Sequence, residues 1–316
     1  MEILDLRQFR AHDLERLLEE ERQFWLERLR WDYTGSVDLI KRFVESRSLP
    51  GYAAVTEGGI IGYCFFVYED HKGLIGDLFV SQPHRGPVEE QLLVHVIETI
   101  RGTPGIRRVE SQLMTFPREL LEPLFQEHHF RSHHRQFLHL DLKSGCASNL
   151  PPRTVDGIEL VEWQESFFDE AGTLITQAYR DHVDSQINDQ YRSLGGALRF
   201  LRNIIHYPGC GIFHPGASWA AFPRGRREMC GLILTSVVNR GIGHVTQVCV
   251  APACQGTGLG YELMRRATET FRAAGYQGLS LTVTAANTPA VRLYQRMGFQ
   301  TLQEFSAYVW NSGAPV

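Results

Sequence analysis

The sequence has few cysteines, and none of them are closely paired. Its six cysteines are spread over 316 residues without one C-x-x-C pair, and four of the six lie in apolar segments. So sparse a set would make a poor disulfide framework, and the pattern is typical of reduced cysteines that fill space. We therefore expect a cytoplasmic protein.

Long apolar runs and an excess of basic charge are missing as well. No stretch approaches the ~18 uninterrupted apolar residues of a membrane span. The first twenty residues predict a short strand and an acidic helix, not a signal peptide. Lys and Arg total 32 against 36 Asp and Glu, a formal charge of −4, so the composition does not indicate a nucleic-acid-binding protein. We expect neither a membrane nor a nucleic acid as partner.

What is present is enough apolar sequence for two folded domains. The chain is about twice the ~150-residue prior for one domain, with 43% hydrophobic and 22% charged residues. The first half also matches the second at a spacing of 169 or 170 residues. The matching pairs are Gly62 with Gly231, residues 78–80 with 248–250, and residues 124–130 with 293–299. Three matches in the same order indicate a duplicated domain.

A segment of small residues that ends in a proline pair separates the two halves. This composition is typical of a linker. We therefore expect one domain at residues 1–142, a linker at 143–155 and a second domain at 156–316.

Strands and helices alternate in the second half. Leu259, Leu263, Ala267 and Phe271 recur every fourth position and predict an amphipathic helix that ends at Gly275. The expected strands are 158–161, 218–222, 229–236, 244–250, 279–283 and 305–310, and the expected helices are 167–179, 194–205, 256–274 and 289–297. This order predicts an α/β-type (α+β) fold with a mixed sheet.

The most specific motif joins the strand at 244–250 to the helix after it. It is Gln255-Gly256-Thr257-Gly258-Leu259-Gly260. Glycines allow close backbone approach, and a helix start offers unpaired N–H groups, so a phosphate or pyrophosphate is the expected ligand. A P-loop would need Lys and then Ser or Thr where Tyr261 and Glu262 stand. A tight turn without a ligand is the alternative.

A second motif lies downstream of the loop. It consists of Asn287, Ala290, Tyr294 and the pair Gly298–Phe299. Loop and motif together resemble the GNAT superfamily of acetyl-CoA-dependent N-acetyltransferases, over about residues 156–316. Within that superfamily, the tandem layout and the end of the chain most resemble the mycothiol synthase branch. The resemblance implies two tandem GNAT-like domains, with acetyl-CoA as co-substrate and no metal.

The resemblance also implies roles for single residues. The amides from Gln255 to Tyr261 would hold the CoA pyrophosphate, and Val248, Cys249 and Val250 would pair with the pantetheine amides. Asn287 and Ala290 would contact the CoA arm, and Tyr294 would face the thioester sulfur. A thiol has a pKa of ~8.5 and a tyrosine ~10, so a hydrogen bond to the leaving thiolate is favoured over full proton transfer. The alternative for Tyr294 is an aromatic core residue, as its counterpart Phe125 suggests.

His244 is the candidate general base, because the resemblance implies a Glu or His six residues before Val250. A solvated histidine beside a glycine turn is equally compatible with the sequence. Thr246 and Val248 would share its strand face, with Gln247 pointing away unless a bulge intervenes. A base of pKa ~6.5 can serve an α-amino-like amine (~8) but not a lysine-like one (~10.4). We therefore expect a small primary amine of low pKa as acceptor.

The first half lacks these parts. Its substitutions are Leu74 for His244, Pro87 for Thr257, Val88 for Gly258, Glu90 for Gly260 and Phe125 for Tyr294. Proline removes an N–H donor and a carboxylate opposes a phosphate. We expect this copy to act as a scaffold or as a wall of the acceptor site.

Further polar groups lie outside these motifs. Arg131 and Arg135 would repel a cation from the histidines between residues 128 and 139. We therefore expect these histidines to be surface side chains and not metal ligands. The polar residues after the helix at 167–179 are candidates for binding the amine acceptor, and a solvated loop is the alternative. They are Asp181, Asp184, Asn188, Asp189 and Tyr191. The prediction is an N-acetyltransferase, monomer or homodimer, with an acyl-CoA sensor or a protein N-acetyltransferase as alternatives.

Overall fold

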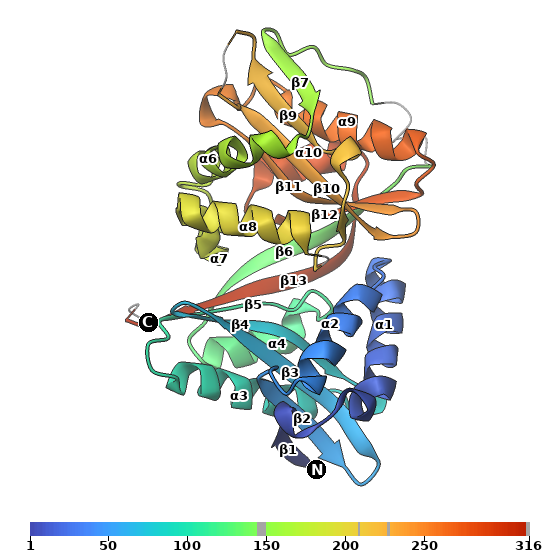
Figure 1. Cartoon of the computed structure of the whole chain (residues 1–316), viewed down its shortest axis with the longest axis vertical. Coiled ribbons are helices and arrows are strands. Elements are labelled where there is room, and N and C mark those ends of the chain that lie inside the picture. Colours follow the sequence, from blue (N-terminus) through green and yellow to red (C-terminus); the bar gives the residue numbers. More distant parts are fainter. Residues whose placement is uncertain (144–149, 208, 226–227, 314–316) are drawn as a thin grey trace. The chain divides into compact units, whose positions relative to one another are not determined.

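The computed structural model describes residues 1–143, 150–207, 209–225 and 228–313 (Figure 1). The chain forms two compact units: unit 1 is Met1–Arg135 with Gln303–Val316, and unit 2 is Gln136–Leu302. Each unit therefore takes its last strand from the other half of the sequence. The limits at 142 and 156 that the repeat suggests stay a prediction. Residues 144–149 of the proposed linker, Cys146 among them, lie outside the described residues.

Unit 1 is a mixed sheet with helices packed on it. Its strands, in sheet order, are β1 (Glu2–Asp5), β2 (Gly51–Thr56), β3 (Gly59–Glu69), β4 (Lys72–Val80), β5 (Arg108–Gln112) and the end of β13 (Gln300–Asn311). The helices are α1 (Glu15–Leu29), α2 (Thr34–Glu45), α3 (Pro87–Gly102) and α4 (Arg118–Glu127). Strands β4 and β5 are parallel and the other neighbours antiparallel. Buried residues of α3 pack on this sheet to form the main core.

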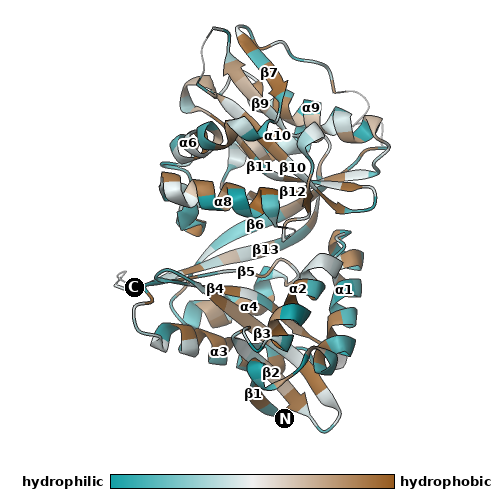
Figure 2. Ribbon diagram, viewed as in Figure 1, coloured by the Kyte–Doolittle hydropathy of each residue, from teal (hydrophilic) through white to brown (hydrophobic). Residues whose placement is uncertain are grey.

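Unit 2 repeats this order. Its strands run β7 (Ile158–Glu162), β9 (Trp219–Pro223), β10 (Gly231–Asn239), β11 (Ile242–Val250), β12 (Gly278–Thr284) and β6 (Arg131–Asp141), with β8 (Ile212–Phe213) beside β10. The helices are α6 (Phe168–Ala178), α7 (Asp184–Ile187), α8 (Leu194–His206), α9 (Leu259–Ala273) and α10 (Thr288–Arg296). One core lies under α9 and α10, and another under α6 and α8. In Figure 2, β10 is largely hydrophobic, whereas α8 alternates between polar and apolar residues. The mixed α/β fold is confirmed.

The two units share an irregularity as well as a topology. In unit 1 the register between β3 and β4 shifts at Gly76, and in unit 2 the register between β10 and β11 shifts at Thr246. The two β-bulges lie 170 residues apart, the spacing of the sequence repeat. A bulge is a specific backbone feature, so this match supports the duplication. None of the helices in the described part of the chain has both the length and the apolar character of a membrane span.

Unit 1 contains a buried pair of carboxyl groups beside its bulge. Glu21 of α1 and Asp77 of β4 are 0% and 3% exposed. The hydroxyl of Tyr63 donates to Glu21 Oε2 at 2.5 Å, and the hydroxyl of Tyr33 donates to Asp77. Burial, and then the charge of Asp77, raises the pKa of Glu21 well above its usual range. Two buried carboxylates in contact cannot both ionise, so the pair holds a proton.

We expect Glu21→Gln to stabilise unit 1 at neutral and alkaline pH. Above the unfolded pKa of ~4.5, the unfolded chain loses the proton that folded Glu21 keeps, so stability falls by up to ~1.4 kcal/mol per pH unit until the folded pKa is passed. A glutamine removes this loss. The gain in melting temperature should vanish near pH 4.5 and grow towards pH 8, while the exposed control Glu27→Gln shows no such trend. A gain that does not depend on pH would contradict the assignment.

Candidate functional site

Strands β11 and β12 of unit 2 are paired along only part of their length. Their pairing ends at Val245 and Leu281, although β11 continues to Val250 and β12 to Thr284. Within the described chain, residues 246–250 therefore have no strand on the β12 side. An unpaired strand edge offers backbone donors and acceptors to an extended ligand.

The bulge at Thr246 sets the direction of the side chains along β11. Val245 and Val248 lie in the same core, the one that α9 covers, because the register shifts by one residue between them. Gln247 therefore shares the face of His244. The expectation that Val248 shares that face is wrong, since a bulge breaks the two-residue alternation on which it rests.

The glycine loop leads from this open edge into α9. Gly256 and Gly258 have φ values of 78° and 94°, in the left-handed region that glycine adopts most easily. The carbonyl of Gly258 accepts the first helical bond, from the N–H of Glu262 at 3.0 Å. The N–H groups of Gly260 and Tyr261 lie before that bond, so they have no acceptor within the helix. The predicted loop thus forms a helix start of the kind that binds anions.

Arg153 lies against this loop. The sequence did not indicate this contact, because residue 153 falls in the expected linker. A Cβ atom at Gly258 would lie 2.7 Å from Arg153 Cδ and 3.1 Å from its Cζ. The backbone N–H of Arg153 donates to Glu262 Oε2 at 3.1 Å, and the Tyr261 hydroxyl donates to the Pro151 carbonyl at 2.8 Å. These bonds hold the segment beside the helix start. A cation directly after a proline pair was the only signal in the sequence.

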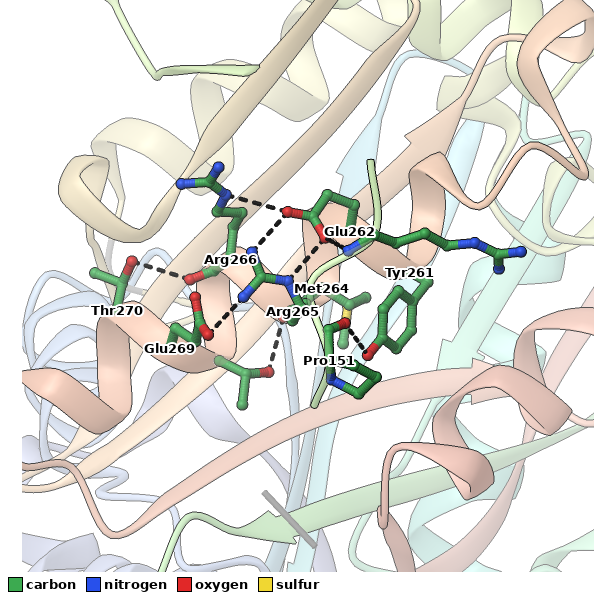
Figure 3. Close-up of polar contacts among 10 residues, drawn as sticks. Pro151, Tyr261, Glu262, Met264, Arg265, Arg266, Glu269 and Thr270 are labelled. Atoms are coloured by element: carbon green, nitrogen blue, oxygen red, sulfur yellow. Dashed lines mark hydrogen bonds and ion pairs between the residues drawn. The ribbon is translucent and has the colours of Figure 1, made fainter. Parts of the chain in front are cut away.

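Further charges line the first turns of α9. Arg265 donates to both carboxylate oxygens of Glu262 at 2.7 Å and forms an ion pair with Glu269 at 2.5 Å (Figure 3). Arg266 also contacts Glu262, at 3.2 Å. A cavity of about 390 Å³ opens here, and its lining includes Arg153, Arg224, Leu259, Arg265 and Arg266. Asp156 and Glu262 also line the cavity, so the glycine loop is bordered by a cavity in which four arginines outnumber two carboxylates.

Tyr294 lies on α10 in the core under α9. It is 6% exposed, and its ring is 5.8 Å from that of Phe299. Burial, and then the charge of Asp184, raises the pKa of Tyr294 well above its usual range. Within the described residues its hydroxyl has no hydrogen-bond partner. At neutral pH the phenol is protonated and keeps its O–H to donate.

Asn287 begins α10. Its side chain accepts from the Ala290 N–H at 3.3 Å, which makes it the N-cap, and its Nδ2 lies 3.0 Å from His182 Nε2. The sequence motif Asn287–Ala290 is therefore a helix cap in this structure. A contact of either residue with the CoA arm stays a prediction.

His244 is buried in β11 and not solvated, so the loop alternative is wrong. It is 7% exposed, its Nδ1 lies 2.9 Å from Ser280 Oγ, and its ring stacks on Phe137 at 5.9 Å. Burial lowers the pKa of His244 to about 3. The imidazole is therefore neutral at physiological pH and a weaker proton acceptor than the sequence led us to expect.

Residues 184–299 match the Acetyltransferase (GNAT) family. This chain contains a GNAT acetyltransferase domain. The chain is similar to the mycothiol acetyltransferase of Mycolicibacterium gilvum, 35% identical over 104 residues, which is 30% of this chain and 33% of that protein. It also resembles the streptothricin acetyltransferase of Streptomyces lavendulae, 44% identical over 55 residues, or 17% and 29% of the two chains. The chain thus spans about a third or less of these relatives.

Solved structures extend the similarity of fold beyond the GNAT domain. A GCN5-related N-acetyltransferase from Sphaerobacter thermophilus has a TM-score of 0.70 at 16% identity, covering 99% of this chain and 98% of that one. A tandem GNAT protein from the clavulanic acid biosynthesis pathway has a TM-score of 0.60 at 14% identity, covering 100% and 99%. At such identities the likeness concerns the fold alone, and it covers both units.

The segment after α6 contributes polar groups to the GNAT domain that the sequence identified only in part. The Tyr179 hydroxyl donates to the Val248 carbonyl at 3.4 Å and accepts from Gln247 Nε2 at 3.0 Å. Asp184 accepts from the Thr284 hydroxyl. Tyr179 was missed, because a tyrosine at the end of an amphipathic helix has no distinctive pattern.

The other polar residues of that segment differ in their surroundings. Tyr191 is 6% exposed and stacks on Tyr179 at 4.3 Å, so it is a core residue. Asp181 is exposed. Asn188 and Asp189 are half-buried, and their role as acceptor contacts stays a prediction.

The counterpart of the loop in unit 1 is already filled by a side chain. Glu89 of α3 is buried and its carboxylate accepts from the N–H of Gly86. The carboxylate at this helix start is therefore that of Glu89, whereas Glu90 is exposed. Phe125, the counterpart of Tyr294, is fully buried and stacks on Tyr308 at 3.9 Å.

Among the residues that the structure describes, no three His, Cys, Asp or Glu side chains are grouped to hold a metal ion.

Proposed function

We propose that the chain is a cytoplasmic acetyl-CoA-dependent N-acetyltransferase that acetylates a small molecule bearing a primary amine. The observation that carries this proposal is the open edge of β11, which ends at a glycine loop with unbonded helix-start amides. An extended arm with a diphosphate at one end fits such an edge and loop. The names of the acetyltransferase relatives support the reaction class.

In this proposal the donor lies along residues 246–250, with Val248, Cys249 and Val250 bonding the pantetheine arm. The amides from Gln255 to Tyr261 bind the diphosphate. A backbone N–H of β11, that of Val248 in our proposal, stabilises the tetrahedral oxyanion. Asn287 and Ala290 border the arm at the start of α10. The residues present thus suit acetyl-CoA.

Tyr294 is proposed to donate a hydrogen bond to the thiolate that leaves. Its raised pKa makes full transfer of the phenol proton still less favourable than for an ordinary tyrosine. A neutral donor in a dry site nevertheless stabilises the developing charge on sulfur. The amine attacks directly, so no acyl-enzyme intermediate is required.

We propose an amine of low pKa as acceptor. His244, with a pKa of about 3, cannot take a proton from a lysine-like ammonium ion of pKa ~10.4. An α-amino-like amine of pKa ~8 is already partly unprotonated at neutral pH. We place His244 in the support of the sheet, with Ser280 and Phe137, and not in the proton transfer.

The experiment that tests this function has two parts. Calorimetry measures acetyl-CoA binding, and a thiol reagent measures CoA release with glycinamide or with Nα-acetyl-lysine amide as acceptor. We expect binding, and faster release with glycinamide. Binding without release for any amine in a wider screen would favour the acyl-CoA sensor, and faster release with lysine peptides would favour a protein acetyltransferase. No heat with millimolar acetyl-CoA would refute the proposal.

We expect Arg153→Ala to weaken CoA binding about tenfold, the size of one charge-assisted hydrogen bond of ~1.5 kcal/mol. Arg272→Ala, an exposed arginine at the far end of α9, is the control and should change nothing. Comparing CoA with 3′-dephospho-CoA by calorimetry locates the contact. An equal loss for both ligands assigns Arg153 to the diphosphate, and a loss for CoA alone assigns it to the 3′-phosphate.

A further inference from the structure

The segment from Tyr179 to Asp184, which runs from the end of α6 to the first residue of α7, is bonded to all three elements that border the open edge. Tyr179 bonds the carbonyl of Val248 on β11, and Asp184 accepts from Thr284 at the end of β12. Between them, His182 Nε2 lies 3.0 Å from the side chain of Asn287, the cap of α10. His182 therefore lies where the ends of β11 and β12 meet the helix that carries Tyr294.

We propose that His182 is the proton acceptor for the attacking amine, with Asp184 as its positioning residue. This inference rests on the proposed function and names a residue for it. The unprotonated amine forms the C–N bond to the acetyl carbon, the C–S bond breaks, and its electron pair stays on sulfur. The proton lost from nitrogen passes to His182 and then to solvent, from which the thiolate takes up a proton.

The surroundings of His182 suit this role. Its Nδ1 accepts from the backbone N–H of Asp184 at 3.1 Å, and Asp184 Oδ2 lies 3.8 Å from the same atom. On protonation, Nδ1 would exchange this bond for one to the Asp184 carboxylate, which stabilises an imidazolium. The side chain of His182 is 28% exposed, so a ligand can reach it, unlike the buried ring of His244. Tyr179 is a further ionisable neighbour, with its ring 5.0 Å away.

Asp184 also connects this histidine to the proposed donor of the thiolate bond. Its charge contributes to the raised pKa of both Tyr179 and Tyr294. The carboxylate thus favours the protonated form of both phenols. The Asp184 carboxylate thus interacts both with the proposed base, His182, and with the proposed hydrogen-bond donor, Tyr294.

The test compares His182 with His244. In His182→Gln, turnover of glycinamide at pH 7 should fall at least 10²-fold, and the pH–rate profile should keep only the acidic limb that protonation of glycinamide itself imposes. Acetyl-CoA affinity, measured by calorimetry, should stay within about twofold and reports that the variant is folded. In His244→Gln both the turnover and the pH–rate profile should match those of the unmodified protein.

A second measurement does not depend on turnover. In NMR spectra of the intact protein, the His182 imidazole signals should shift when glycinamide is added, and this shift should be smaller in Asp184→Asn. His182 signals that glycinamide leaves unchanged, full turnover in His182→Gln, or an equal loss of turnover in His244→Gln would each overturn the proposal. Failure of acetyl-CoA to bind the unmodified protein would instead refute the proposed function.

Discussion

Tyr294→Phe should lower turnover by about 10²-fold while leaving acetyl-CoA affinity unchanged. The phenol is the donor proposed for the leaving thiolate, and loss of one such donor typically costs a factor of that order. The ring itself packs in the core beside Phe299, and phenylalanine keeps this packing. Stopped-flow measurement of thiol release, with calorimetry of acetyl-CoA in parallel, separates the chemical step from binding.

A matched change in unit 1 provides the control. Tyr308 also has a buried ring, which stacks on Phe125, the counterpart of Tyr294. Tyr308→Phe should leave turnover as it is. Unchanged turnover in Tyr294→Phe would mean that the residue is only part of the core, the alternative that Phe125 illustrates.

Gly258→Val should weaken acetyl-CoA binding by 10²-fold or more. At φ = 94°, a β-branched residue is strained. The loop must therefore rearrange, and its N–H groups no longer point at the diphosphate. Loss of two charge-assisted bonds of ~1.5 kcal/mol each accounts for a change of this size. Isothermal calorimetry gives the affinity, and circular dichroism shows whether α9 is still formed.

Gly275→Val separates binding from stability. Gly275 follows the other end of α9 with a similar φ of 81°, so its substitution strains the same helix without touching the loop. Both variants should lose stability, Gly258→Val the more because its side chain also meets Arg153, but only Gly258→Val should lose the ligand. Equal affinities in the two would show that the loop does not bind the diphosphate.

Local sequence patterns predicted most of the fold of unit 2. The four-residue spacing from Leu259 to Phe271 identified α9, and the alternation at residues 279–283 identified β12, because one buried face imposes each period. The glycine loop was equally readable, since two positive φ values nearly require glycine. The short elements α7 and β8 were missed, as they are too short to show a period.

Other features depend on contacts between distant residues and left no local signal. The bulge at Thr246 changes which face of the sheet the preceding side chains share with the following ones. Nothing in the alternating run 244–250 indicates this bulge. The burial of His244 follows from Phe137 and Ser280, which lie far away in the sequence. His182 is identified as a candidate only by its contact with Asn287, which lies more than a hundred residues downstream.

The sharing of terminal strands between units has a practical consequence for anyone who shortens the gene. Strand β12 is neighboured by β6, and β5 by β13, so neither half of the coding sequence specifies a complete sheet. A fragment starting at residue 156 would leave the β12 edge bare, and bare edges recruit other chains into aggregates. An autonomous catalytic fragment would need residues 136–142 grafted back on.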